Sequence, residues 1–215
     1  MNVGLVITAA GSGSRFGGDT PKQFLPIDGV PMIVKSCRAF DDFIMITDRV
    51  VTVSVDHFSR MEDLLGAHDL LDRFRLIEGG ATRCRSVQNG VNALLNCDYV
   101  MIHDAARPWV SADLIKRLLK KASPTHGVIP GVSVSDTLKQ VENAMVVGTL
   151  NRESIIRVQT PQVFPVSILL KIYRQFPELD TTDEAGLFEA TGYPVVVAEG
   201  EEGNVKVTVP SDVGG

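Results

Sequence analysis

A glycine-rich segment near the start of the chain carries two positive charges that could act on an anion. The run AAGSGSRFGG contains Arg15, and Lys22 follows shortly afterwards in PKQF. Glycine lets backbone N–H groups approach an anion closely, and two cations suit a triphosphate better than a ribose or a flavin. The segment therefore indicates phosphate binding. Solvated surface charges remain the plainer interpretation of Arg15 and Lys22 when each is taken alone.

The same segment does not match two well-known phosphate-binding loops. A Walker A loop needs a lysine after its second glycine, where this chain has Asp19 and Thr20. A dinucleotide-binding fingerprint needs a third glycine where Phe16 stands, and an acidic residue about 20 positions further on. Both comparisons fail, so an NAD-dependent oxidoreductase is disfavoured.

An aspartate and a lysine later in the chain could complete an anion site. Asp104 follows the apolar run YVMIH and precedes Arg107, and Lys206 lies in GNVKVTV near the C-terminus. A carboxylate can hold Mg²⁺, which prefers one or two carboxylates together with phosphate oxygens and water. Asp104 could equally cap the next segment or pair with Arg107, and Lys206 could be an ordinary outward-facing residue. The residues alone leave these alternatives open.

The composition is typical of a soluble globular domain. The 215 residues are 44% hydrophobic and 22% charged, with a net charge of -5, whereas nucleic-acid binding needs a basic face. No apolar run approaches the roughly 20 residues that cross a bilayer, and the N-terminus has no signal-peptide pattern. We therefore expect a cytoplasmic protein without a nucleic-acid or membrane partner. The three cysteines and four histidines form no zinc-binding pattern.

The hydrophobic periodicity predicts an alternation of strands and helices. Strands are expected at residues 3–8, 50–55, 73–77, 99–103, 127–134, 194–198 and 205–209. Helices are expected at residues 32–40, 59–65, 82–95, 112–122, 166–176 and 183–191. This order predicts a parallel sheet with helices on both faces, in which ligands bind beyond the carboxyl ends of the strands.

A hairpin arm is expected outside this sheet. Two polar strand-like pieces, 136–141 and 145–149, could pair through a turn at Glu142 and Asn143. We therefore expect a single α/β domain over residues 1–215, with an arm at approximately 133–157.

Taken together, the motifs resemble the 2-C-methyl-D-erythritol 4-phosphate cytidylyltransferase family of the nonmevalonate isoprenoid pathway. The matching segments are AAGSGSRFG with PKQF, GGATRCRSV, IHDAARPWV, SDTLK, QTPQVF, TDEA and GNVKVTVPSD. Their order and spacing cover nearly the whole chain. The resemblance implies a Rossmann-like nucleotidyltransferase with a mostly parallel twisted sheet and a protruding β-hairpin arm. It also implies CTP and a polyol phosphate as substrates, and Mg²⁺ as the cofactor.

The resemblance further implies a role for particular residues. Those implied to border the nucleotide are Ala9, Ala10, Gly11, Gly13, Gly80, Ala81 and Ser86. Those implied to contact its phosphates as catalytic residues are Arg15, Lys22 and Lys206. Those implied to border the sugar-alcohol phosphate are Asp104, Arg107, Thr137, Arg152, Thr160 and Thr182, with Asp104 also the expected metal ligand. In the family the arm crosses to a neighbouring subunit, so a homodimer is expected in which Thr137 and Arg152 serve the partner's site.

Two other functions remain open. Ribitol 5-phosphate cytidylyltransferases share the fold, although HDAARP and DTLK are more similar to the methylerythritol branch. A non-catalytic nucleotide-binding protein on the same fold is a further alternative, against which the joint presence of Arg15, Lys22, Asp104 and Lys206 argues. The sequence departs from the family at Thr8, where proline is common, and at Ala81, where an acidic residue often stands.

Overall fold

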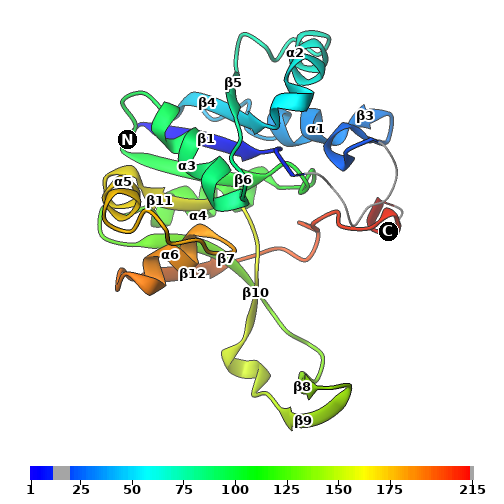
Figure 1. The fold of residues 1–215 in the computed structure, drawn as a ribbon, viewed down its shortest axis with the longest axis vertical. Coiled ribbons are helices and arrows are strands. Elements are labelled where there is room, and N and C mark those ends of the chain that lie inside the picture. Colours follow the sequence, from blue (N-terminus) through cyan, green and yellow to red (C-terminus); the bar gives the residue numbers. More distant parts are fainter. Residues whose placement is uncertain (12–19, 214–215) are drawn as a thin grey trace.

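The computed structural model describes residues 1–11 and 20–213 (Figure 1). Within these ranges, eight strands form the main sheet. They are β1 (Val3–Thr8), β4 (Ile46–Val53), β5 (Arg75–Glu78), β6 (Tyr99–Asp104), β7 (Gly127–Ser133), β10 (Ile156–Val158), β11 (Gln162–Pro165) and β12 (Val195–Glu199). The helices are α1 (Met32–Arg38), α2 (Phe58–Gly66), α3 (Arg83–Ala93), α4 (Ala112–Lys121), α5 (Val166–Gln175) and α6 (Glu184–Ala190). Short 3₁₀ helices span Lys22–Phe24, Val55–His57, Arg152–Ser154 and Pro210–Val213.

The main sheet is mixed but mostly parallel. Its strand order is β10-β7-β11-β6-β1-β4-β5, and β12 pairs with β7 in addition. The pairs β1·β4, β1·β6, β4·β5 and β7·β12 are parallel, whereas β11 runs antiparallel to both β6 and β7. The next strands of the parallel sheet lie on opposite sides of β1, with β4 on one side and β6 on the other, so the strand order reverses at β1. In such sheets this reversal opens the crevice in which ligands bind.

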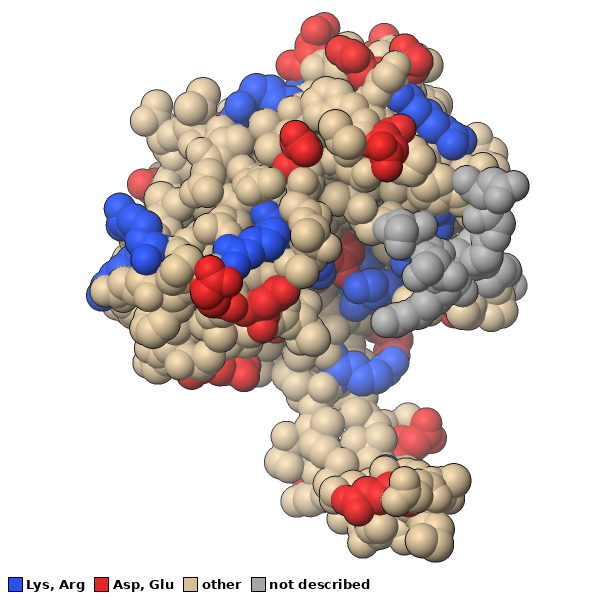
Figure 2. Space-filling model, viewed as in Figure 1, with Lys and Arg blue, Asp and Glu red and all other residues tan. Residues whose placement is uncertain are grey.

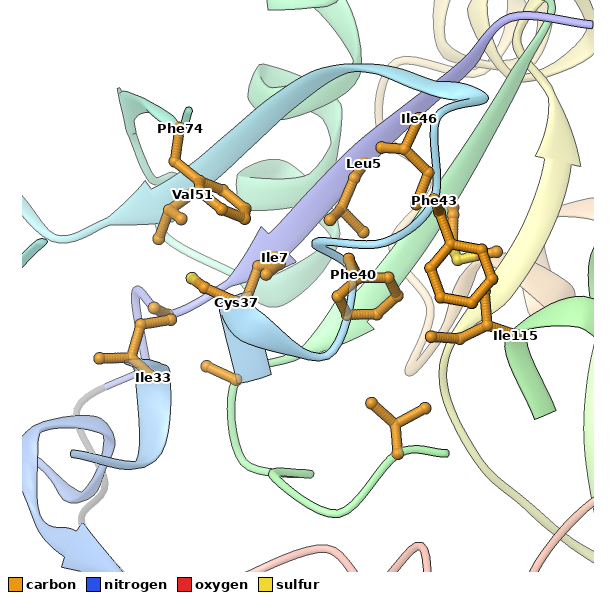
Figure 3. Packing of buried hydrophobic residues seen from close by; sticks show 14 of the residues in the cluster. Leu5, Ile7, Ile33, Cys37, Phe40, Phe43, Ile46, Val51, Phe74 and Ile115 are labelled. Atoms are coloured by element: carbon orange, nitrogen blue, oxygen red, sulfur yellow. The ribbon is translucent and has the colours of Figure 1, made fainter. Parts of the chain in front are cut away.

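Both faces of the sheet are covered, because its central strands are apolar on both sides. On β1, Leu5 and Ile7 belong to one buried cluster and Val6 to the other. The first cluster packs against α1, α2 and α4 (Figure 3), and the second packs against α3, α5 and α6. Phe40 and Phe164 are fully buried, one in each cluster. The expected α/β class with helices on both faces is therefore confirmed.

Several helix starts follow from side-chain caps. Thr82 precedes α3 and accepts a hydrogen bond from the Arg85 amide at 3.2 Å. Ser111 caps α4 and Asp183 caps α6 in the same way. These residue types satisfy backbone N–H groups that have no partner within the first turn of a helix. The caps on α3 and α6 matter for the site, because each directly precedes a charged residue described below.

A two-stranded hairpin projects from the sheet (Figure 1). It consists of β8 (Lys139–Glu142) and β9 (Met145–Thr149). Its turn lies at Asn143 and Ala144, both with positive φ, and not at Glu142 and Asn143 as expected. Another small hairpin joins β2 (Pro26–Ile27) to β3 (Val30–Pro31).

One expected strand is wrong. Residues 205–209 form no strand, because their backbone follows the loop after β6 instead of pairing with the sheet. The Val207 amide donates to the Ala106 carbonyl at 2.8 Å, and Asp212 accepts from the amides of Thr208 and Val209. This path brings Lys206 beside Asp104. In the part of the chain that is described, no helix has the length and apolarity that a membrane span requires.

The close packing of α3 on the sheet gives a test of the fold. A Cβ atom at Gly90 would lie 2.6 Å from Val6 and 3.1 Å from Thr52. We therefore expect Gly90→Ala to lower the free energy of unfolding by about 1–2 kcal/mol in urea denaturation, since overpacking outweighs the gain in helix propensity. Asn92→Ala, at an exposed position of the same helix, should stay within about 0.5 kcal/mol. Equal stability of the two variants would contradict the packing.

Candidate active site

Two adjoining cavities lie at the carboxyl ends of β1 and β6. The larger, of about 430 Å³, is lined by Thr8, Ala9, Ala10, Gly11, Lys22, Gln23, Gly80, Ala81, Thr82, Arg83, Ser86, Asp104, Ala105, Ala106 and Lys206. The smaller, of about 230 Å³, is lined by Arg83, Asp104, Arg107, Val158, Gln159, Thr160, Gln162, Thr182, Asp183 and Lys206. Figure 2 shows lysine and arginine side chains gathered in a hollow of this face, above the arm.

The two cavities separate the two sets of residues expected from the sequence. Ala9, Ala10, Gly11, Gly80, Ala81 and Ser86, expected at the nucleotide, all line the larger cavity. Asp104, Arg107, Thr160 and Thr182, expected at the polyol phosphate, all line the smaller one. Three residues, Arg83, Asp104 and Lys206, line both. These three form the boundary between the cavities.

The loops after β1 and β5 meet at the larger cavity. Gln23 is buried, and its Nε2 donates to the carbonyls of Ala9 and Gly11, at 2.9 and 3.3 Å. On the other side, a Cβ atom at Gly79 would lie 2.4 Å from the Cβ atom of Ala10. Only glycine allows this approach of the two loops. The backbone of both loops is thus held in place around the cavity.

Ser86 organises the second of these loops. Its hydroxyl donates to the Thr82 carbonyl at 2.9 Å and accepts from the Gly80 amide at 3.0 Å. The side chain is buried. Ser86 therefore fixes the turn that carries Gly80 and Ala81 against the start of α3.

Asp104 is the charged residue at the centre of the site. It ends β6 and pairs in register with Thr8 at the end of β1. Its Oδ2 lies 2.7 Å from Nζ of Lys206, and its Oδ1 lies 3.2 Å from Nε of Arg83. The Thr8 hydroxyl donates to the same Oδ1 at 3.3 Å. Thr8 thus adds a neutral hydrogen-bond donor to this carboxylate.

The charges around Asp104 keep it ionised. Burial alone would raise the pKa of this carboxyl group, but Arg83 and Lys206 outweigh burial and hold the pKa far below its usual range. Arg83 is also bound by Glu184, which is fully buried on α6, at 2.9 and 3.0 Å. Burial lowers the pKa of Arg83, yet the carboxylates of Glu184 and Asp104 raise it overall. Among the described residues, the site therefore contains three ion pairs, which link Arg83 to Glu184, Arg83 to Asp104 and Lys206 to Asp104.

His103 and Thr160 hold the backbone beneath Asp104. The Thr160 hydroxyl accepts from the Asp104 amide at 3.0 Å and lies 3.2 Å from Nδ1 of His103. Nε2 of His103 lies 3.1 Å from the Arg107 carbonyl. A tautomer with the proton on Nε2 satisfies both contacts of the ring. Burial lowers the pKa of His103 to about 4, so the ring is neutral at pH 7.

Arg107 and Lys22 both bind carbonyl groups near the C-terminus. Nη1 of Arg107 donates to the Asn204 carbonyl at 2.7 Å, and this arginine is buried. Nζ of Lys22 donates to the Val207 carbonyl at 2.7 Å. Together they fasten the segment that carries Lys206 across the loops after β1 and β6.

The arm residues lie apart from both cavities. Thr137 is exposed just before β8, and Arg152 donates to the Ser135 carbonyl at the base of the arm. Neither lines the larger or the smaller of the two cavities described above. The remaining expected residues, Gly13 and Arg15, lie outside the described residues.

Sequence reasoning did not assign three residues that organise the site: Gln23, Arg83 and Glu184. Each lies within a motif that was recognised, namely PKQF, GGATRCRSV and TDEA. A charged residue directly after a helix-capping Thr or Asp is the available signal for Arg83 and Glu184. The sequence gives no sign that these two residues, 101 positions apart, form a pair.

A mostly parallel α/β sheet with two adjoining cavities at its switch point, joined by a cluster of charges, defines a nucleotide-binding protein of the nucleotidyltransferase class. Comparison with known protein families identifies the family within this class. The model of the 2-C-methyl-D-erythritol 4-phosphate cytidylyltransferase family (IspD) matches residues 3–214, and the chain belongs to this family.

Individual relatives agree with this assignment. A 2-C-methyl-D-erythritol 4-phosphate cytidylyltransferase of Cereibacter sphaeroides is 38% identical over 99% of this chain and 94% of its own length. A bifunctional enzyme IspD/IspF of Desulfotalea psychrophila is 39% identical over 99% of this chain, which spans 55% of that protein. The crystal structure of a 4-diphosphocytidyl-2C-methyl-D-erythritol synthase from Anaerococcus prevotii has a TM-score of 0.85 at 26% identity, covering 99% of this chain and 92% of that one.

The buried, neutral His103 predicts a particular dependence of stability on pH. Its pKa is about 4 in the folded protein and about 6.5 when unfolded, so between these values the unfolded chain binds more protons. We expect stability to fall by roughly 3 kcal/mol as the pH falls through this window. Protonation of Asp104 would lower the stability only below about pH 4, which is the pKa of this carboxyl group in the unfolded chain.

Urea denaturation between pH 7 and pH 4 measures this effect. His103→Gln should flatten the decline, because glutamine has no proton to gain, and the same substitution at the half-buried His68 serves as the control. A decline that is equally steep in His103→Gln would show that His103 is not its source.

Proposed function

We propose that this protein transfers a cytidylyl group from CTP to 2-C-methyl-D-erythritol 4-phosphate, giving 4-diphosphocytidyl-2-C-methyl-D-erythritol and diphosphate. The observation that carries the proposal is the pair of adjoining cavities that share Arg83, Asp104 and Lys206. A reaction between two phosphorylated molecules needs two sites that meet at a centre of fixed charge. Membership of the cytidylyltransferase family supports the identity of the two substrates.

The chemistry requires charge control more than proton transfer. An oxygen of the phosphate monoester attacks the α-phosphorus of CTP, and the bond from that phosphorus to the bridging oxygen of the diphosphate breaks. A phosphate monoester has a second pKa near 6, so the nucleophile is already largely ionised at pH 7. The protein must position two anions that repel each other and stabilise the departing diphosphate. The absence of a general base from the proposed mechanism follows from this chemistry.

Lys22, Lys206 and Arg15 are proposed to supply this stabilisation. Lys22 and Lys206 line the larger cavity, in which the triphosphate would lie. Lys206 is 41% exposed at its side chain although it contacts the buried Asp104, so its ammonium group can reach a ligand. Arg15 belongs to the same glycine-rich segment as the residues proposed to hold the nucleotide.

Mg²⁺ is proposed to enter as the complex with CTP. Among residues 1–11 and 20–213, no three His, Cys, Asp or Glu side chains gather as a metal site. Asp104 provides one carboxylate, and its oxygens are engaged by Arg83 and Lys206. This donor set suits an ion held mainly by phosphate oxygens and water, with Asp104 as the single protein ligand. The ion would neutralise the phosphates that repel the incoming monoester.

The arm is proposed to join two copies of the chain. Its apolar side chains are unusually open to solvent: Met145 is 68% exposed, Val146 62% and Val141 55%. Exposed apolar groups gathered on one projecting element are typical of an interaction site. A homodimer in which each arm reaches the neighbouring site would bring Thr137 and Arg152 to the polyol phosphate, from which they are remote within one chain.

The proposed reaction predicts which mixtures release diphosphate. With CTP, Mg²⁺ and 2-C-methyl-D-erythritol 4-phosphate we expect turnover, with lower kcat/KM for UTP and for purine triphosphates because backbone groups around Ala9, Gly80 and Ala81 border the base. Excess EDTA should abolish turnover. Faster reaction with ribitol 5-phosphate would assign the related cytidylyltransferase activity instead. Nucleotide binding without diphosphate release from any of these substrates would indicate a non-catalytic protein.

The two groups of cations should differ in their kinetics. Lys22→Ala or Arg15→Ala should lower kcat by roughly 10²-fold or more, as expected when about 3 kcal/mol of transition-state stabilisation is lost. Arg152→Ala should chiefly raise KM for the polyol phosphate, because it removes a contact with this substrate and does not change the stabilisation of the departing diphosphate.

Mixing the variants tests the dimer. At a polyol phosphate concentration far below the KM of Arg152→Ala, each variant alone should turn over little substrate. In a heterodimer of Lys22→Ala with Arg152→Ala, one site would carry both changes and the other neither, so part of the activity should return. The matched control is a mixture of Lys22→Ala with Arg15→Ala, which damages both sites and should stay inactive. If the first mixture also stays inactive after verified subunit exchange, the arm does not complete the partner's site.

A further inference from the structure

A fully buried glutamate lies behind the charges that the two cavities share. Glu184 is the first residue of α6 and has no exposed surface. Both of its carboxylate oxygens accept from Nη1 of Arg83, at 3.0 and 2.9 Å. Within the described residues no other group hydrogen-bonds to this carboxylate. A buried charge is costly unless it is paired, so Glu184 strongly restricts where Arg83 can lie.

Arg83 continues this contact toward the site. Its Nε donates to Oδ1 of Asp104 at 3.2 Å, and Oδ2 of Asp104 lies 2.7 Å from Nζ of Lys206. The four side chains form a line of alternating charge from α6, through the start of α3 and the end of β6, to the segment near the C-terminus. We refer to Glu184, Arg83, Asp104 and Lys206 as the ion-pair line.

The line has a direction from the interior to the ligands. Glu184 lines neither cavity, whereas Arg83, Asp104 and Lys206 line both. The exposed fraction of the side chain is 0% at Glu184, at one end, and 41% at Lys206, at the other. The buried end is therefore anchored in the protein, and the open end is the ammonium group that can meet a phosphate.

Arg83 reaches both carboxylates although one of its donors is left without a partner in the described part of the chain. Its Nη2 atom is buried without a hydrogen-bond partner among the described residues. An unsatisfied buried donor is unfavourable. The contacts of the guanidinium group with two carboxylates at once compensate for this cost. Lysine could not do this in the same way, because its single ammonium group lacks the planar fork of arginine.

We infer that Glu184 and Arg83 are positioning residues, which fix Asp104 and through it hold the Lys206 ammonium group between the two phosphorylated substrates. The identity of those substrates rests on the proposed function, whereas the positions of the side chains do not. Misplacing a catalytic group by about 1 Å can cost on the order of 10²-fold in rate, so Glu184 affects turnover although it lines neither cavity.

The test removes the anchor without leaving a buried charge unpaired. The double variant Arg83→Met/Glu184→Gln takes away both members of the buried pair, and such replacements often preserve stability. Arg83→Lys keeps the positive charge but cannot bridge both carboxylates, and it serves as a second variant if the double variant folds poorly. Arg75→Met, which removes a partly exposed ion pair with Asp48, is the matched control.

Two measurements on each folded variant decide the inference. In crystal structures of the double variant, we expect the Asp104 carboxylate and Nζ of Lys206 to shift together by about 1 Å or more from their positions in the unchanged protein. In steady-state kinetics we expect kcat to fall by about 10²-fold in the double variant and about 10-fold in Arg83→Lys, with Arg75→Met unchanged. Unshifted positions of both groups together with kcat within about threefold of the unchanged protein would overturn the inference.

The two measurements separate this inference from the proposed function. Failure of the proposed function appears as an unchanged protein that releases no diphosphate from CTP. The positions of Lys206 and Asp104 in the variants still decide whether Glu184 and Arg83 position them.

Discussion

The arrangement of the site depends on one buried carboxylate. Asp104 stands at the carboxyl end of β6, paired in register with Thr8 at the end of β1, where the strand order of the sheet reverses. Burying it would be unfavourable without partners, and Arg83 and Lys206 provide them from different parts of the chain. The need to compensate this charge brings α3 and the C-terminal segment to one point. The two cavities lie on either side of that point.

Rigidity around Asp104 comes from neutral groups as well as from charges. The Thr160 hydroxyl accepts a hydrogen bond from the backbone amide of Asp104. The fully buried His103 contacts both Thr160 and the Arg107 carbonyl. A neutral histidine can serve this purpose without adding another charge to a crowded site. In the larger cavity, Gln23 holds backbone carbonyls in a similar way. Preorganised polar groups of this kind are what a reaction between two anions requires, because they need no rearrangement as charge develops.

The sequence predicts the strands and helices around the site well, because buried parallel strands and capped helices have strong local patterns. It does not predict the path of residues 205–209, whose alternating pattern favours a strand but whose hydrogen bonds go to the loop after β6. It also cannot predict the Arg83–Glu184 pair, because such contacts depend on how α3 and α6 meet in space. Motif resemblance predicts Asp104, Thr160 and Lys206 in one site, and all three line the smaller cavity, whereas Thr137 and Arg152 lie apart from it within one chain.

We propose that two ligand sites meet at Asp104, Arg83 and Lys206. A crystal structure with a non-reactive CTP analogue and the polyol phosphate tests it most directly. We expect the cytosine ring beside Gly80 and Ala81 in the larger cavity, and the polyol phosphate beside Arg107 and Thr160 in the smaller one. The α-phosphorus should lie next to Lys206. Binding of both ligands on the same side of Asp104, or of either ligand outside these cavities, would contradict it.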